Sequence, residues 1–181
     1  MADEKIAIIV NNIENTEQII GQLMDNYSDD VLHLVFSYVK NRTTAEDLTQ
    51  EIFIKCYEKL GQFNHKSSIK TWLYRIAINH CKDYLRSWHY RKIKFSDKIW
   101  DHIPSKSKHV EEEIISRNVA DSLTSAVMDL PVKYREVAFL HYYEELSLAN
   151  ISKITGVNRN TLKTRLKHAR ELLKNKMKKE V

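Results

Sequence analysis

Paired carboxylates are the first residues in this sequence whose spacing can support chemistry. Asp47 and Glu51 stand four positions apart in "AEDLTQEIFIKCYEKL", so a helix would bring both carboxylates to one face. Such a pair can act as acid and base or hold a metal ion, but we find no companion His and no nucleophile. Cys56 and Cys81 stand alone, without CxxC spacing, and are predicted to be small buried apolar residues. We therefore expect no enzyme activity, no catalytic residue, no cofactor and no metal site.

A second kind of chemistry, the binding of a polyanion, is indicated by "TGVNRNTLKTRLKHAR" at residues 155–170. Five Lys or Arg and one His fall within its last twelve residues. At about 100° per residue, one helix face gathers the apolar side chains and the other gathers polar and basic ones. The apolar face holds Leu162, Leu166, Ala169 and Leu173, and the polar face holds Asn160, Lys163, Thr164, Lys167 and His168. An amphipathic helix whose outer face reads nucleic acid is the prediction.

Charge is divided into blocks along the chain, although its total is only +5 at pH 7. Residues 61–96 hold eight basic side chains against one acidic, and residues 151–181 hold ten against two. The other blocks are acidic, with five basic against eleven acidic side chains in residues 1–60 and six against ten in residues 97–150. Two basic blocks predict two contacts with a polyanion and leave acidic surface for another partner; basic helix faces that are merely solvated are the plain alternative.

The elements that must position these residues are predicted to be helices. Only three Gly and two Pro occur in 181 residues, so hairpins and tight turns have little support and an all-α chain is expected. Periodicity predicts helices over residues 16–40, 45–60, 69–90, 110–129, 131–143 and 148–155, and another from residue 158. The apolar run 6–10 is too short for a signal-peptide core, and no stretch approaches the ~20 apolar residues of a membrane span. We expect a cytoplasmic protein without direct membrane insertion.

The C-terminal part has the order of a helix-turn-helix. Pro131 is predicted at the first position of its helix, where a missing N–H costs nothing. Ser147 is predicted to cap the next short helix, Gly156 to supply the positive φ of a tight turn, and Asn158 to cap the helix that follows. A short helix, a Gly-containing turn and a second helix with a polar outer face together predict DNA recognition.

A linker is predicted before that unit, over residues 96–109. The stretch has no helical period, contains Pro104, and is rich in Ser and Lys. Trp100 is the one residue within it that can dock on a domain.

The helix at 45–60 is predicted to separate a core stripe from a docking face. Thr43 and Glu46 predict a capping box at its start, and Gly61 predicts a C-cap at its end. An Ile exposed within an acidic patch fits a protein-docking face better than a solvated surface. The core stripe comprises Ala45, Leu48, Ile52, Phe53, Cys56, Tyr57 and Leu60, and the opposite face Asp47, Gln50, Glu51, Ile54 and Glu58.

The helix at 69–90 divides in the same way, with basic residues interleaved with an aromatic and an amide. Cations for phosphates, a ring for stacking and an Asn for a base edge are what unpaired DNA requires. Core packing is the alternative for Trp72, and a local hydrogen bond is the alternative for Asn79. The preceding loop, "FNHKSSIKT", can wall a pocket for an unstacked base. The buried stripe is Leu73, Ala77, Cys81, Tyr84 and Trp88, and the other side is Trp72, Arg75, Asn79, Lys82 and Arg86.

Taken in order, "AEDLTQEIFIKCYEKL", "FNHKSSIKTWLYRIAINHCKDYLR" and "LPVKYREVAFLHYYEELSLANISKITGVNRNTLKTRLKHARELL" resemble a bacterial RNA polymerase sigma factor of the extracytoplasmic-function group. The resemblance covers roughly residues 17–177. It implies two small all-helical domains joined by a flexible linker: sigma region 2 at 1–95, the linker at 96–109 and sigma region 4 at 110–181. The implied function is that of an alternative sigma factor, which binds core RNA polymerase and directs promoter-specific initiation in response to envelope or extracellular stress.

The resemblance also implies roles for individual residues. Asp47, Gln50, Glu51 and Ile54 match the helix that docks on the clamp helices of the largest polymerase subunit, and region 4 implies a contact with the flap. The residues implied for the minus-10 element and its flipped base are Phe63, Lys66, Ser67, Ser68, Trp72, Arg75, Asn79, Lys82 and Arg86. Those implied for the minus-35 element are Asn160, Lys163, Thr164, Arg165, Lys167, His168 and Arg170, with Arg165 and Arg170 on phosphates.

The sequence departs from the family pattern at two places, and the same resemblance implies one further partner. The usual Glu-Ile-Ala of the first motif helix is Asn150, Ile151 and Ser152 here. Arg75 and Ile76 stand where primary sigma factors continue an aromatic run. This difference implies weaker strand opening and a stricter requirement for a matching promoter sequence. A membrane-anchored anti-sigma factor is the implied inhibitor.

Two other classes of function remain as alternatives. A free-standing helix-turn-helix regulator with a helical sensor domain would explain the C-terminal half but would leave the first basic block and the acidic face unused. An enzyme that modifies nucleic acid lacks a nucleophile, a metal cluster or a phosphate loop in this sequence.

Overall fold

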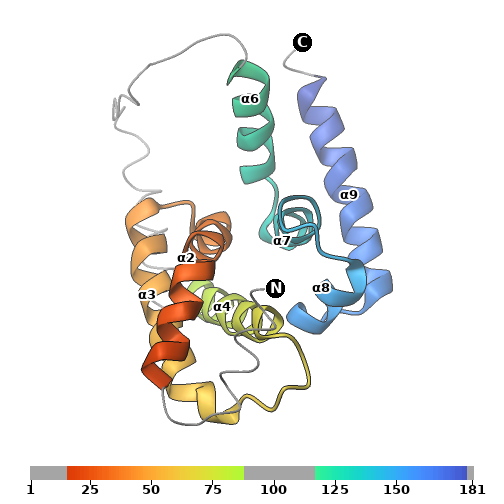
Figure 1. Cartoon of the computed structure of the whole chain (residues 1–181). Coiled ribbons are helices and arrows are strands. Elements are labelled where there is room, and N and C mark those ends of the chain that lie inside the picture. The colour runs from red at the N-terminus through yellow and green to blue at the C-terminus, as the bar shows by residue number, and fades with distance from the viewer. Residues whose placement is uncertain (1–15, 88–116, 179–181) are drawn as a thin grey trace.

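All regular secondary structure in the described part of the chain is helical, as predicted. The computed structural model describes residues 16–87 and 117–178 (Figure 1). Residues 1–15, the predicted linker at 96–109, Trp88 and Trp100 lie outside these ranges. The elements are α2 (Thr16–Val39), α3 (Arg42–Lys59), a 3-10 turn (Leu60–Gln62), α4 (Ile69–Arg86), α6 (Arg117–Met128), α7 (Val132–Ala138), a π-helical turn (Phe139–Tyr143), α8 (Leu148–Thr155) and α9 (Arg159–Met177).

The first half consists of α2, α3 and α4 packed on one another. Helix α2 buries Leu23, Tyr27, Val31 and Leu34, which recur every three or four residues and form one apolar stripe. It ends where Lys40 takes a φ of 59° and donates its N–H to the carbonyl of Phe36. The predicted helix at 16–40 is therefore confirmed to within one residue.

Helix α3 begins and ends differently from the prediction. Its N-cap is Asn41, whose side chain accepts the N–H of Thr44 at 2.9 Å. The predicted capping box of Thr43 and Glu46 is wrong, because Glu46 accepts from the Arg42 guanidinium at 2.6 Å instead. Gly61 is not a C-cap, since the helix tightens into the 3-10 turn without a left-handed residue there.

Helix α4 starts as predicted and stops earlier. Ser68 caps it by accepting the N–H of Thr71 at 3.2 Å. The prediction extended the helix to residue 90, but Ser87 adopts an extended ψ of 153° and ends it at Arg86.

The second half contains the predicted helix-turn-helix. Ser147 accepts the N–H of Asn150, Asn158 accepts that of Asn160, and Gly156 lies at a φ of 71° between α8 and α9. These three capping and turn predictions are confirmed. Pro131 is the N-cap of α7 rather than its first residue, and the helix continues through the π-helical turn to Tyr143. The predicted helix at 110–129 is described from Arg117, as α6.

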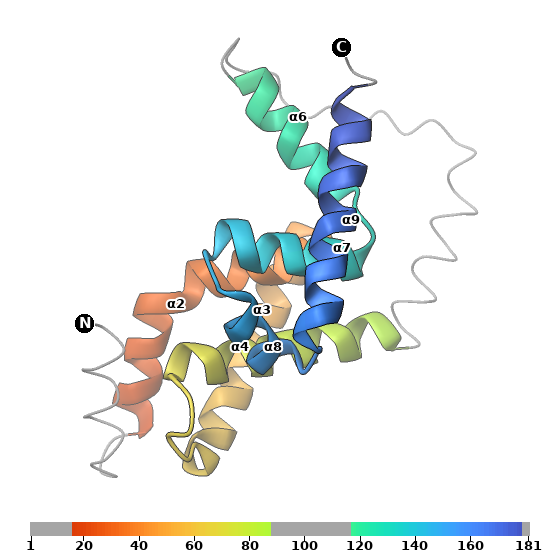
Figure 2. The ribbon, with the colours of Figure 1, turned by 90° about the vertical axis from the view of Figure 1, so that its right-hand side faces the viewer.

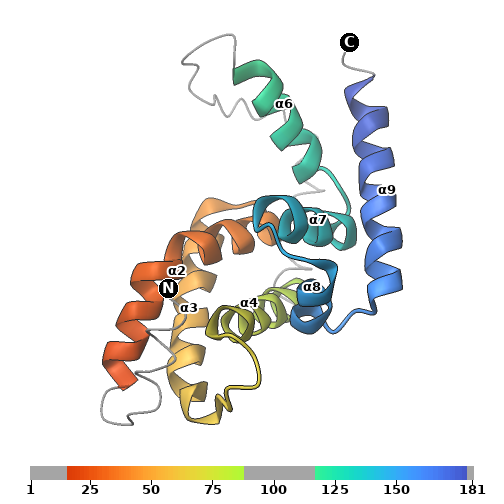
Figure 3. The same ribbon diagram turned by 45° about the vertical axis from the view of Figure 1, so that its right-hand side comes forward.

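The two halves share one hydrophobic core. Buried side chains of α2, α3 and α4 form a continuous cluster with Val137, Leu140, Ile151, Ile154 and Leu162 of the second half. Helix α4 packs against α8, and α2 against α7 (Figure 2). Helix α9 begins in this core beside α8 and runs past α7, and α6 packs against it beyond the core (Figure 3). The basic helix α4 is therefore held directly against the second half.

The described helices include no candidate membrane span. None of them combines the length and the apolar character that a transmembrane span requires.

Candidate nucleic-acid interface

An acidic face lies on the outer side of α3. Asp47, Gln50, Glu51 and Ile54 are all exposed, and Ile54 retains 59% of its accessible surface. Glu58 is exposed beside them. We call the first four residues the acidic face. Their exposure agrees with the face predicted from the helical wheel.

Tyr57 does not belong to the α3 core stripe, contrary to the prediction. It is 49% exposed, whereas Phe53 and Cys56 are buried. At about 100° per residue, Tyr57 lies about 40° from Phe53 and about 60° from Ile54, at the edge of the apolar stripe. Tyr57 therefore widens the apolar spot around Ile54.

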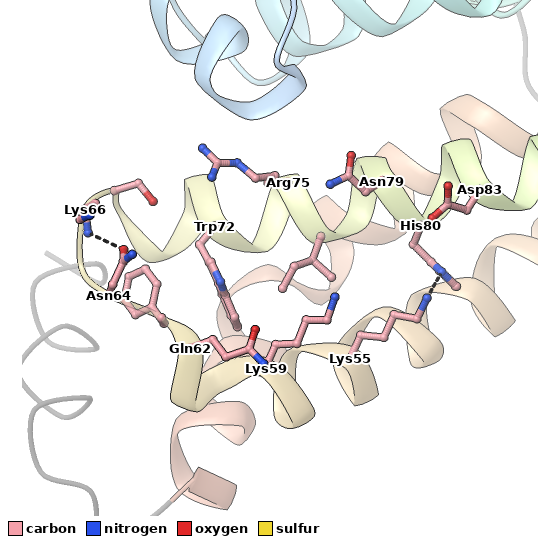
Figure 4. Close-up of a pocket in the computed structure, with 13 residues that line it drawn as sticks. Lys55, Lys59, Gln62, Asn64, Lys66, Trp72, Arg75, Asn79, His80 and Asp83 are labelled. Atoms are coloured by element: carbon pink, nitrogen blue, oxygen red, sulfur yellow. Dashed lines mark hydrogen bonds between the residues drawn. The ribbon is translucent and has the colours of Figure 1, made fainter.

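A cavity of about 420 Å³ opens between α4, the end of α3 and the loop that joins them (Figure 4). We call it the α4 cavity. Four cationic side chains and one carboxylate lie around it, so its rim is positively charged and suits a phosphate next to a flat ring. It is lined by Lys55, Lys59, Gln62, Phe63, Asn64, Lys66, Ser67, Trp72, Arg75, Ile76, Asn79, His80 and Asp83.

The cavity brings together six of the nine side chains predicted for unpaired DNA. Phe63, Lys66, Ser67, Trp72, Arg75 and Asn79 line it, whereas Ser68, Lys82 and Arg86 do not. Asn64, from the loop predicted to wall the pocket, also lines it, and the residues that the sequence analysis did not propose are Lys55, Lys59, Gln62, Ile76, His80 and Asp83. Lys55 and Lys59 come from α3, so their placement depends on how α3 packs on α4.

Trp72 occupies an intermediate position between the two predicted roles. Its ring is half-buried and packs against Phe63 with centroids 5.4 Å apart. It also points from α4 toward α3, into the cavity (Figure 4). Phe63 is buried and also lines the cavity. Trp72 therefore packs against its neighbour and also lines the cavity.

The cations of α4 are paired with groups of the second half. Arg75 donates to the carbonyl of Lys153 at 2.8 Å, and Lys82 forms an ion pair with Glu136 at 2.8 Å. The Glu136 side chain is only 4% exposed. Arg86, by contrast, pairs with its neighbour Asp83 on the surface. The second half thus supplies the counter-charges for part of this basic helix.

A second buried carboxylate completes the contact between the halves. Glu144 accepts from the Tyr74 hydroxyl at 2.6 Å and pairs with Lys70 at 3.2 Å. Burial lowers the pKa of Lys70, but Glu144 and Asp30 outweigh it and raise the pKa above the usual value. Burial and the hydrogen bond to Glu144 likewise raise the pKa of Tyr74. Lys70 therefore stays charged in this contact.

The outer face of α9 is exposed to solvent. Asn160, Lys163, Thr164, Lys167 and His168, which we call the α9 face, are all exposed, while Leu162, Leu166 and Ala169 are buried. The predicted division of this helix is confirmed. Arg170 is exposed and Arg165 half-buried. Glu171 lies 3.1 Å from His168 and 3.9 Å from Lys167, so an anion already accompanies part of the face.

Glu51 does have a histidine partner, which the sequence analysis missed. Nε2 of His80 lies 2.8 Å from Glu51, and Nδ1 of the same ring lies 2.7 Å from the Lys55 ammonium. The signal in the sequence is only the i, i+4 spacing of Glu51 and Lys55 on α3. Because His80 comes from α4, its place between them depends on tertiary packing.

The cysteines are buried, as predicted. Burial raises the pKa of Cys56 and that of Cys81 to about 12, which leaves both as unreactive thiols. Within residues 16–87 and 117–178, no group of three or more His, Cys, Asp or Glu is arranged to hold a metal ion.

Comparisons with known proteins agree with this architecture. The family model for Sigma-70 region 2 matches residues 23–90, and that for Sigma-70 region 4 matches residues 120–173. Among solved structures, CnrH in complex with the cytosolic domain of CnrY covers 100% of both chains, with a TM-score of 0.71 at 18% identity. The sigma factor RpoE in complex with the anti-sigma factor NepR, from Bartonella quintana, covers 87% of this chain and 96% of that chain, with a TM-score of 0.68 at 23% identity. These two structures show the likeness of fold.

Sequence relatives extend over nearly the whole chain. RNA polymerase sigma factor SigV of Bacillus subtilis (strain 168) is 31% identical over 169 residues, which are 92% of this chain and 96% of the relative. ECF RNA polymerase sigma factor SigW of the same organism is 30% identical over 164 residues, 87% of this chain and 88% of the relative. The chain therefore belongs to the ECF RNA polymerase sigma factors, which are transcription initiation factors.

Proposed function

We propose that this sigma factor directs promoter-specific initiation by reading two promoter elements with two surfaces, the α4 cavity and the α9 face. The domain assignment behind this proposal is region 2 at 1–95, a linker at 96–109 and region 4 at 110–181. The observation that carries it is the cation-rimmed α4 cavity, which combines an aromatic ring and an amide in a volume that suits an unstacked base. The exposed α9 face supports the second contact.

The α4 cavity is proposed to capture a flipped base of the minus-10 element. Trp72 would stack on the base, Asn79 would bond its edge, and Lys66 and Arg75 would meet phosphates. Base capture outside the stack favours local melting, because a strand held unpaired cannot re-anneal. The remaining residues proposed to bind the minus-10 element are Phe63, Ser67, Ser68, Lys82 and Arg86.

The α9 face is proposed to enter the major groove at the minus-35 element. Asn160, Lys163, Thr164, Lys167 and His168 are the side chains that a recognition helix would present to base edges. Arg165 and Arg170 would neutralise phosphates and position the helix.

The acidic face is proposed to dock on the clamp helices of the largest polymerase subunit. Its two carboxylates supply charge and Ile54 supplies an apolar anchor, a combination typical of a protein interface. Region 4 is proposed to meet the flap. Polymerase then holds both DNA-reading surfaces at a fixed separation, so that two modest contacts act as one specific contact.

The contacts between the halves bear on how the free protein behaves. Lys82, Arg75 and Lys70 pair with the second half, and DNA phosphates would have to displace those partners. We propose that the free protein binds promoter DNA poorly for this reason, and that docking on polymerase favours an arrangement in which the halves separate.

An anti-sigma factor is proposed as the inhibitory partner. Both solved neighbours are complexes, CnrH with the cytosolic domain of CnrY and RpoE with the anti-sigma factor NepR. We propose a membrane-anchored protein of this kind here, which would hold the sigma factor at the membrane until an envelope or extracellular signal arrives. The released protein would act in the cytoplasm, at the nucleoid.

The direct test is transcription in vitro. Purified protein is added to core polymerase on fragments of the genome that encodes it, and transcript starts are mapped. We expect starts that share one upstream and one downstream sequence element. Absence of any specific start would overturn the proposal, and site-specific DNA binding without polymerase would favour a free-standing helix-turn-helix regulator instead.

A further inference from the structure

A buried histidine joins the acidic face to the α4 cavity. The His80 ring, 9% exposed, lies between Lys55 and Glu51, at 2.7 Å from the ammonium and 2.8 Å from the carboxylate. Figure 4 shows Lys55 reaching His80 from the opposite helix. Glu51 belongs to the acidic face, and Lys55 lines the α4 cavity. One side chain of α4 therefore contacts a member of each surface.

The donors and acceptors determine the direction of this hydrogen-bond chain. A lysine ammonium can only donate, so Nδ1 of His80 is the acceptor and carries no proton. The ring proton is then on Nε2, which donates to the Glu51 carboxylate. Ammonium, neutral ring and carboxylate form a chain in which each bond polarises the next.

The ring also separates two side chains that would otherwise pair. Glu51 and Lys55 are four residues apart on α3, with the carboxylate on the N-terminal side, which is the favourable order for a direct ion pair. Within the described residues, Glu51 and Lys55 form no ion pair with each other; each is bonded to His80. A direct pair would turn the carboxylate toward the cavity and the ammonium toward the acidic face, so each charge would be partly neutralised by the other.

We propose that His80 is a positioning residue that holds the Glu51 carboxylate for polymerase and the Lys55 ammonium for a strand phosphate at the rim of the α4 cavity. The inference rests on the proposed function of these two surfaces. His80 also lines the α4 cavity, but both of its ring nitrogens are bonded to Lys55 and Glu51, so in this scheme it acts through these two side chains. Its loss affects both contacts at once, because Glu51 and Lys55 then collapse onto each other.

The experiment compares His80→Leu with His80→Gln in the full-length protein. Leu removes both hydrogen bonds, whereas the Gln amide keeps one acceptor and one donor. Two affinities are measured: that of the protein for core polymerase, and that of the holoenzyme for a single-stranded oligonucleotide carrying the minus-10 sequence. We expect His80→Leu to weaken each by about five- to tenfold and His80→Gln to restore most of both.

A double-mutant comparison separates positioning from a general packing role. In a Glu51→Gln background, His80→Leu is expected to cause no further loss of polymerase affinity, and in a Lys55→Gln background no further loss of strand affinity. Binding of the holoenzyme to upstream duplex alone serves as the internal control, since the proposed upstream contact uses the α9 face and His80 lies on α4. Thermal unfolding of each variant shows that it is folded.

Several results would overturn the inference. If His80→Leu acts by packing alone, its losses of affinity add to those of Glu51→Gln and Lys55→Gln, and His80→Gln does not rescue them. Unchanged affinities in a folded His80→Leu protein would refute it as well. If Glu51→Gln and Lys55→Gln themselves leave both affinities unchanged, the proposed roles of the two surfaces fail, and the inference fails with them.

Discussion

The α9 face and helix α4 carry similar basic residues, but they differ in exposure. The α9 face is open to solvent, whereas the second half of the protein covers part of α4. Lys163 and Lys167 of α9 lie exposed, and Glu171 is the acidic neighbour on their own helix. Lys82 and Arg75 of α4 are bonded to groups of α7 and α8 instead. A basic surface of the first kind can meet DNA at once, whereas one of the second kind must first exchange partners. In the proposed function, α4 is therefore the surface whose binding to DNA requires a conformational change.

Asn79 provides the largest expected effect. Asn79→Ala removes the proposed bond to a base edge inside the α4 cavity, and a good base contact contributes about 1–3 kcal/mol. We expect open-complex formation to fall by about ten- to a hundredfold, measured as permanganate reactivity of unpaired thymines. The loss should persist on templates without the upstream element, and a loss confined to templates that carry it would contradict the assignment.

Lys163 and Lys167 test the other surface. We expect Lys163→Ala or Lys167→Ala to reduce transcription about tenfold on a template with both elements, through weaker binding of upstream duplex. Templates without the upstream element should show no change relative to the unmodified protein. Equal losses on both templates would remove the functional distinction between α9 and α4.

Glu144 tests whether the second half restrains α4. Glu144→Gln removes the charge that pairs with Lys70 while keeping an acceptor for the Tyr74 hydroxyl. We expect the free protein to bind a minus-10 single strand about three- to tenfold more tightly, with a larger distance between fluorophores on the two halves. Thermal unfolding should confirm that the variant is folded. Unchanged strand affinity and distance would show that this contact does not limit access.

Asp129 offers a matched control with the smallest effect. It pairs on the surface with Lys176 of α9 and with Lys40, which directly follows the last residue of α2. The hydrogen bond and charge of Lys176, with a smaller part from Lys40, lower the pKa of Asp129 from 3.8. The pair therefore stabilises the fold above that pH and stops doing so as pH falls through the lowered pKa. We expect Asp129→Asn to lower the free energy of unfolding by less than about 1 kcal/mol at pH 7, because solvent screens an exposed pair. At the acid end of the titration we expect the substitution to leave the free energy of unfolding unchanged.

Local sequence signals predicted the α9 face well and the surroundings of α4 only in part. The division of α9 follows from helical period alone, and Ser147, Gly156 and Asn158 act through neighbours within three or four residues. The partners of α4 are far away in the chain: Glu136 lies 54 positions from Lys82, and Glu144 lies 70 from Tyr74. No periodicity encodes such pairings.

The same limit explains the individual errors. Asn41 competed with Thr43 as a helix cap, and the sequence alone does not decide which short polar residue takes the position. Tyr57 fell at the boundary of its stripe, where tertiary packing determines exposure. His80 was missed as a partner of Glu51 because the contact requires the packing of α3 on α4.

The shared core has a kinetic consequence for holoenzyme assembly. If the halves separate as proposed, apolar surface of the cluster that includes Val137, Ile151 and Ile154 becomes exposed, so this step would have a barrier of its own, independent of polymerase. If opening precedes docking, the assembly rate rises with polymerase concentration only until opening becomes limiting, and then levels off. The plateau rate would equal the rate at which the halves separate, which depends on how tightly one half of the chain packs on the other.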